Sequence, residues 1–290
     1  MKAIRLIIIC LLIAGGLQAQ LPQGRTKATI IADALAQLPA DNQTQYSQTM
    51  TDLVSTGEEG LLELIGRMNP PGNQSNERLD YAISGWTNFV ANDEARRAVA
   101  ADAFGKALGQ SLDNEVKAFV IRQLGQIGTD QHVESLAALL KEEQLSAPAA
   151  QALVSIGSEK AKEAIAAELS ASRSEKLKIN LINALGQARY SPAEQILLSE
   201  LGENPSEEIA NSVLAALGSM GTRNAIVPLK NAAKKVNYSY QGANGATAAY
   251  FTAEAVGQER SERGGKRGRT AARFCRQTES SRFKGGRITT

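Results

Sequence analysis

A pattern of apolar residues recurs about every 30 residues through the middle of the chain. With Leu124 as the reference position, equivalent leucines follow after 29, 32 and 32 residues. Apolar residues also recur eight, four and three residues before each reference position, and 12 and 16 residues after it. Side chains three and four residues apart share one face of a helix, so each copy predicts two amphipathic helices. The residues eight before the reference are Val116, Leu145, Leu177 and Ile209, those four before are Val120, Ala149, Leu181 and Val213, and those three before are Ile121, Ala150, Ile182 and Leu214. The reference leucines are Leu124, Leu153, Leu185 and Leu217. The residues 12 after are Leu136, Ile165, Leu197 and Leu229, and those 16 after are Leu140, Leu169, Leu201 and Ala233.

The junction between the two helices of each copy is repeated as well. Each first helix is expected to end at a left-handed residue, which closes a helix, and a hydroxyl residue that can cap the second helix follows it. At Ser191, the following Pro192 and Glu194 predict a capping box. The expected closing residues are Gly128, Gly157, Arg189 and Gly221, and the expected caps are Thr129, Ser158, Ser191 and Thr222.

Because one helix hairpin buries only one face, neighbouring hairpins must stack to complete a core. The predicted fold is therefore all-α, a right-handed α-solenoid of helix hairpins whose second helices line the inner curve. The array is expected over residues 77–256 and an irregular helical N-terminal cap over 20–76. Further helices are expected over 26–38, 46–54, 61–68, 79–90, 95–108 and 247–256, with the clearest internal loop at 69–73.

Short units with Leu-Gly-x-Ile-Gly between two apolar helices, as at 124–128, resemble HEAT-like repeats of the phycobilisome-lyase kind over roughly residues 78–256. This resemblance implies an architecture and no particular activity, because such arrays serve many tasks. The segments 31–35 and 57–61 resemble the front of long exported bacterial proteins in which helical repeats precede a keto-disaccharide hydrolase-type domain. The sequence has no such β-sandwich domain, so its activity is not carried over.

The first nineteen residues have the pattern of a secretory signal peptide. Lys2 and Arg5 precede an apolar run over 6–14, and small residues lead to a cleavage point after Ala19. The pattern predicts export to the periplasm or the cell exterior. No other segment approaches the roughly 20 apolar residues of a spanning helix, so no stable membrane span is expected after cleavage. The two cysteines, Cys10 and Cys275, lie outside residues 20–256, so no disulfide is expected there.

Residues 257–290 lose the apolar pattern and become basic. They hold ten of the chain's 32 Lys and Arg and three of its 30 Asp and Glu, and the first nineteen residues hold two more basic residues. Residues 20–256 therefore carry 20 basic and 27 acidic residues, and this acidic balance argues against binding nucleic acid. The tail is expected to be disordered, and three interpretations stay open: a shifted reading frame, a solvated end without function, or a segment that binds an anionic polymer or a membrane surface.

The sequence offers few candidate catalytic residues. His132 is the single histidine, so one chain cannot assemble a histidine metal site or a Ser-His-Asp triad. Its offset is occupied by Ala161, Ala193 and Ala225 in the other copies, which predicts a packed helix-face residue. Trp86 is likewise expected in the core, and no cofactor, metal site or catalytic residue is predicted.

The expected function is that of an exported scaffold that mediates protein–protein interaction. Tyr238 and Tyr240, in an inserted loop, and Tyr190, beside an inter-helix turn, are the candidate contacts with a protein partner or a polysaccharide-linked one. The alternative is the truncated N-terminal part of an exported glycan-active hydrolase whose catalytic domain is missing. A purely structural spacer is a third hypothesis.

Overall fold

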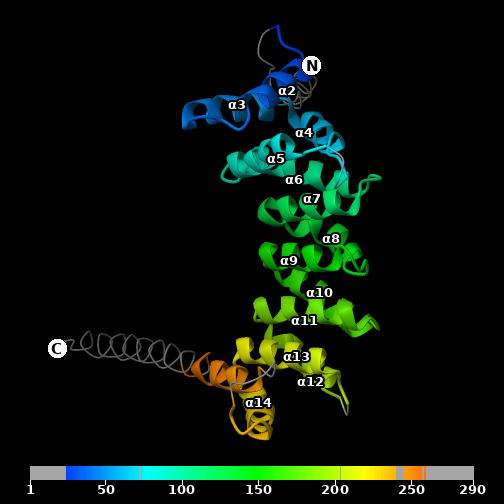
Figure 1. Ribbon diagram of the computed structural model, residues 1–290, viewed down its shortest axis with the longest axis vertical. Helices are drawn as coiled ribbons and strands as arrows, with labels where there is room; N and C mark the ends of the chain where they lie inside the picture. Colours follow the sequence, from blue (N-terminus) through cyan, green and yellow to red (C-terminus); the bar gives the residue numbers. More distant parts are fainter. Residues whose placement is uncertain are drawn as a thin grey trace, which may run out of the picture. The chain divides into compact units, whose positions relative to one another are not determined.

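The computed structural model describes residues 24–70, 72, 74–202, 204–239, 245–256 and 258 (Figure 1). The described residues form helices joined by turns and loops and contain no strand, which confirms the predicted all-α class. The predicted signal peptide and residues 259–290 of the predicted tail lie outside them. The chain divides at Ser158 into two compact units, which are described separately.

The first unit contains the predicted helices of the N-terminal segment and the first hairpins of the repeat. The expected helices over 26–38, 46–54 and 61–68 are present as α2, α3 and α4, and α5 pairs with α6 as expected. The bounds are α2 Lys27–Gln37, α3 Gln43–Ser55, α4 Gly57–Gly66, α5 Glu77–Val90, α6 Glu94–Leu108, α7 Asn114–Ile127, the 3-10 helix η1 Asp130–His132, α8 Val133–Leu139 and α9 Ser146–Ile156.

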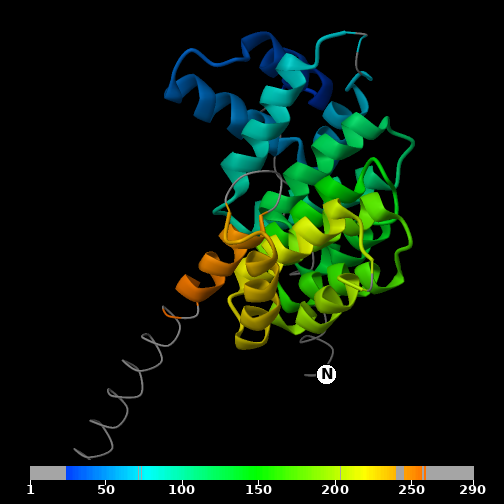
Figure 2. The same cartoon turned by 60° about the horizontal axis from the view of Figure 1, so that its bottom comes forward.

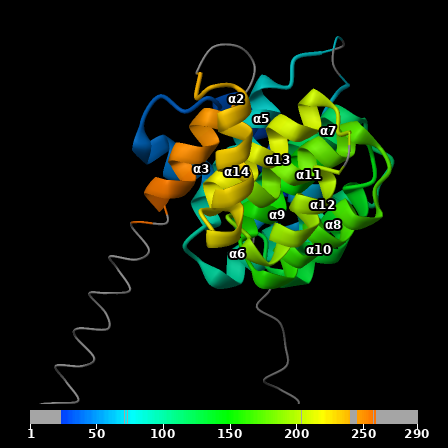
Figure 3. The same ribbon diagram turned by 90° about the horizontal axis from the view of Figure 1, so that it is seen from below.

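The second unit continues the repeat and ends in the expected additional first helix, at 246–256. Figures 2 and 3 show this last helix beside α13 and α14. The bounds are α10 Glu159–Ala171, α11 Glu175–Gln187, the 3-10 helix η2 Ser191–Ala193, α12 Glu194–Glu200, α13 Glu207–Met220 and α14 Arg223–Lys235.

The apolar repeat positions form the core of both units. The four reference leucines are completely buried, and so are the residues four before them. Every other position of the pattern is buried except Leu201, which is half-buried. The period of the sequence therefore identified the core correctly.

Consecutive first helices approach closely because a glycine of one copy faces an alanine of the next. A Cβ placed on Gly125 would lie 2.9 Å from the Cα of Ala152, and one on Gly186 would lie 2.7 Å from the Cα of Ala216. Each glycine follows a reference leucine and each alanine precedes the next one. The pairs α7 and α9, and α11 and α13, are thus held backbone against backbone.

The prediction that all four closing residues are left-handed is wrong at one junction. Gly157, Arg189 and Gly221 have φ values of 70°, 48° and 58°. Gly128 instead has an extended backbone with φ of −67°. A Cβ at Gly128 would lie 2.6 Å from the carbonyl oxygen of Leu124, so glycine provides space there rather than a left-handed turn.

The predicted capping box at Ser191 does not form, because Ser191 begins the short 3-10 helix η2 and no side chain caps that helix. Glu194, 7% exposed, reaches the next junction instead, where it accepts hydrogen bonds from the Thr222 hydroxyl and from Asn224 Nδ2. Thr222 also caps α14 through the Ala225 amide, as predicted.

A capping box forms at Thr129, and it includes the single histidine. His132 Nδ1 accepts a hydrogen bond from the Thr129 backbone N–H at 3.2 Å. His132 Nε2 lies 3.2 Å from Asp102 Oδ1 on α6. The ring is 7% exposed, which confirms that His132 is a packed residue of the array.

Candidate functional site

The three tyrosines predicted as partner contacts have different environments. Tyr190 is 8% exposed. Its pKa is raised, mainly by burial and to a smaller extent by a hydrogen bond to Glu159. Tyr238 is 37% exposed and lies beside the rings of Tyr250 and Phe251, at centroid distances of 6.1 and 6.5 Å. Tyr240 is outside the described residues. Tyr238 therefore keeps an accessible surface, whereas Tyr190 is held inside the second unit.

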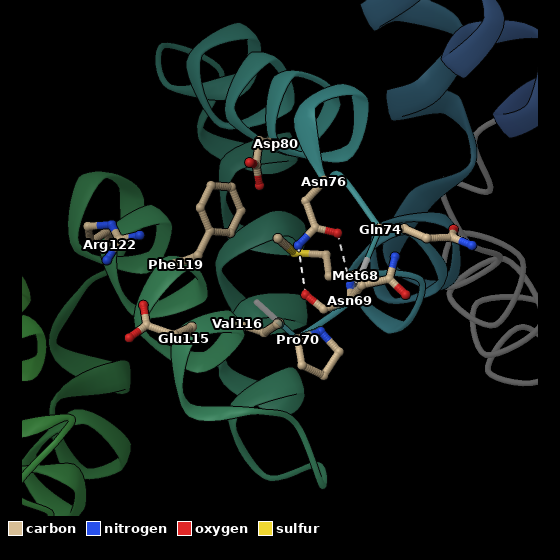
Figure 4. A pocket seen from close by; sticks show the side chains of 10 residues that line it. All are labelled: Met68, Asn69, Pro70, Gln74, Asn76, Asp80, Glu115, Val116, Phe119 and Arg122. Atoms are coloured by element: carbon tan, nitrogen blue, oxygen red, sulfur yellow. Dashed lines mark hydrogen bonds between the residues drawn. The ribbon is translucent and has the colours of Figure 1, made fainter. Parts of the chain in front are cut away.

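A cleft of about 280 Å³ lies in the first unit, between the connection that precedes α5 and the helices α5 and α7 (Figure 4). The sequence predicts a loop at 69–73 but no site beside it. The side chains that line the cleft are Met68, Asn69, Pro70, Gln74, Asn76, Asp80, Glu115, Val116, Phe119 and Arg122.

The helices α5 and α7, which border the cleft, are less closely packed than the pairs α7 and α9 or α11 and α13. Gln123 directly precedes the reference leucine of its copy, a position that is occupied in the other copies by Ala152, Ala184 and Ala216. Its side chain is 5% exposed, and its Nε2 donates to Ser84 Oγ on α5 at 3.3 Å. A buried amide between the helices takes the place of the glycine–alanine contact, so α5 and α7 share few contacts. A glutamine in a series of alanines is the sequence signal that could have indicated this opening.

Asn76 fixes the connection that forms one wall of the cleft. Its Oδ1 accepts from the Asn69 backbone N–H and its Nδ2 donates to the Asn69 carbonyl oxygen, both at 2.8 Å (Figure 4). Asn76 also precedes α5 at the N-cap position, yet its side chain does not cap the helix. The asparagine thus holds the loop rather than the helix end.

The opposite wall combines an aromatic ring with charged groups. The Asp80 carboxylate lies near the Phe119 ring, across the cleft from Asn76 and Met68 (Figure 4). Arg122 Cζ lies 5.9 Å from the Phe119 ring centroid, a cation–π arrangement. Burial raises the pKa of Asp80, while the charge of Arg122 acts in the opposite direction. Glu115, in the first turn of α7, is exposed at the rim.

The lining groups favour binding a polar chain that has apolar parts. They offer carboxylates, amides and a guanidinium beside the surfaces of Met68, Val116 and Phe119. Over the residues that the structure describes, no cluster of three metal-ligating side chains occurs, and no helix has the length and apolar character needed to cross a bilayer.

No protein-family model matches the chain, and comparison with curated proteins also finds no match.

Proposed function

We propose that this chain is an exported scaffold of HEAT-like helix hairpins, stacked as a right-handed α-solenoid, that binds a protein partner. The buried apolar period supports the repeat architecture, and the charged and apolar pattern of residues 1–19 supports export. Such arrays serve as binding surfaces because each hairpin adds to a continuous face.

The observation that carries the proposal is the cleft between α5 and α7. Gln123, next to the lining residue Arg122, is a buried glutamine where other copies have the small residue that packs consecutive first helices. A groove along α5, lined by residues that include Tyr81 and Ser84, shares Asn76 and Asp80 with it. A cleft that continues into a groove suits an extended segment of a protein better than a small compact molecule.

The proposal is tested by capture of a partner from an envelope extract of the source organism with the full chain and two matched variants. Phe119→Ala removes the aromatic wall of the cleft, and Tyr238→Ala removes the exposed tyrosine of the second unit. We expect one enriched protein with the wild type and with Tyr238→Ala, at least tenfold less with Phe119→Ala, and 1:1 binding when that protein is purified.

Circular dichroism confirms that each variant retains its helices. Equal capture by Phe119→Ala, or capture by none of the three proteins, would overturn the proposal. Loss with Tyr238→Ala alone would place the interface in the second unit and overturn the assignment to the cleft.

A further inference from the structure

We propose that the cleft receives a lysine or arginine side chain of the partner, with its cationic head at the carboxylate of Asp80 and the negative charge of Glu115 at the rim (Figure 4). This inference rests on the proposed function and specifies the chemistry that the partner presents.

The first observation is that these carboxylates have no direct partner. Among the described residues, neither Asp80 nor Glu115 accepts a side-chain hydrogen bond or forms an ion pair. Other acids of the same unit are paired, for example Asp52 with Arg25 at 2.7 Å. Arg122, the nearby cation, lies over the Phe119 ring.

The second observation is that Asp80 carries a desolvation cost within the unbound chain. Asp80 is half-buried, and this partial removal from water raises its pKa because it disfavours the charged carboxylate, while the charge of Arg122 offsets only part of the effect. A cation arriving from outside would offset that cost and gain a charge-assisted hydrogen bond. A carboxylate of this kind in a cleft is a candidate for ligand contact.

The third observation is the shape and lining of the cleft. Its volume of about 280 Å³ is at the lower limit of small-molecule pockets, so one long side chain suits it. Met68, Pro70, Val116 and Phe119 supply apolar surface along which the methylene groups of lysine or arginine can pack while the charged head stays polar.

Charge selects a cation over an anion. The cleft and its adjoining groove contain Glu77, Asp80 and Glu115 against the single cation Arg122. Residues 20–256 as a whole hold 27 acidic and 20 basic residues, a balance that favours the approach of a basic partner. Arg122 also covers one face of Phe119, which leaves less of the ring for stacking a sugar.

The test is a titration of the isotope-labelled full chain with Nα-acetyl-arginine amide, Nα-acetyl-lysine amide and the uncharged Nα-acetyl-norleucine amide, followed by amide chemical shifts. We expect saturable shifts in residues 67–76, α5 and α7 with both cationic probes and at least tenfold weaker binding of norleucine. Asp80→Asn is expected to weaken cation binding at least tenfold, and Glu115→Gln several-fold. Glu94→Gln, at the exposed start of α6, makes the same change in net charge and is expected to leave binding unchanged.

Equal binding of norleucine, equal weakening by Glu94→Gln, absence of saturable shifts, or stronger shifts of the same amides with the neutral disaccharide cellobiose would each overturn the inference. Partner capture that needs Phe119 but survives Asp80→Asn would also overturn it and leave the proposed function standing. Cation binding at the cleft without any captured partner would support the inference and count against the proposed function.

Discussion

At the scale of single residues, the cleft is built from side chains that give up local stability. Asn76 occupies the N-cap position of α5 but bonds to the backbone of Asn69, so α5 lacks a cap worth about 1 kcal/mol. Asp80, one turn later, is desolvated without a direct partner. Departures from local rules of this kind are expected at functional positions.

We expect Asp80→Asn to raise the free energy of unfolding at pH 7 by up to about 0.5 kcal/mol. The pKa of Asp80 is higher in the folded than in the unfolded chain, so the cost of its charge is fully present above the folded pKa. That cost disappears as the pH falls below the unfolded value of 3.8. Urea unfolding at pH 7 and pH 3 checks this, with a gain expected only at pH 7.

Glu77→Gln is the matched control for Asp80→Asn, because Glu77 is an exposed acid in the same first turn. It loses a favourable interaction with the helix N-terminus and is expected to lower stability by a few tenths of a kcal/mol. A loss of stability at pH 7 with Asp80→Asn would show that the carboxylate has a stabilising contact in the folded chain.

At the scale of helices, the residue directly before each reference leucine decides how closely first helices pack. With glycine facing alanine, the backbones of α11 and α13 touch at Gly186 and Ala216. With Gln123 at the same offset, α7 is separated from α5 by an amide that bonds to Ser84. The same repeat thus produces a closed contact in one pair and an opening in another.

We expect Gly186→Ala to lower the free energy of unfolding by about 1 to 3 kcal/mol, because the added methyl group would overlap the backbone of α13. Gly66→Ala is the control, since Gly66 is an exposed helical glycine with no atom within 4 Å of an added Cβ. It is expected to be neutral or to stabilise by up to about 1 kcal/mol. Urea unfolding of both variants measures the difference.

Adding Ala216→Gly to Gly186→Ala is not expected to restore stability, because the Cα of Ala216, and not only its Cβ, lies 2.7 Å from the added group. Full recovery in this double variant would show that the helices are separated by side chains alone, contrary to the close backbone contact described above.

At the scale of the whole molecule, the proposed role depends on export. Residues 6–14 form an apolar run that ends before the small residues leading to Ala19. The body that would be exported is acidic and has no cysteine between residues 20 and 256, so no disulfide within it contributes to its stability.

We expect the exported chain to begin at Gln20, as determined by N-terminal sequencing or mass spectrometry of the protein from cell envelope or medium. Leu12→Arg interrupts the apolar run and is expected to keep the chain in the cytosol with Met1 in place, whereas Leu12→Ile preserves the run and export. An unprocessed wild-type chain confined to the cytosol would contradict the prediction.

The helices and most of the core could be predicted from the sequence, because the spacing that places Leu124, Leu185 and their neighbours on one helical face is a local property of the chain. The pairing of polar groups could not be predicted in this way. Glu194 binds Thr222 and Asn224 rather than closing its own capping box, and Gln123 meets Ser84, 39 residues away. Such pairings depend on how hairpins stack, and apolar periodicity carries no information about them. For the same reason the sequence indicated the loop at 69–73, while the cleft beside it emerged from the packing of α5 against α7.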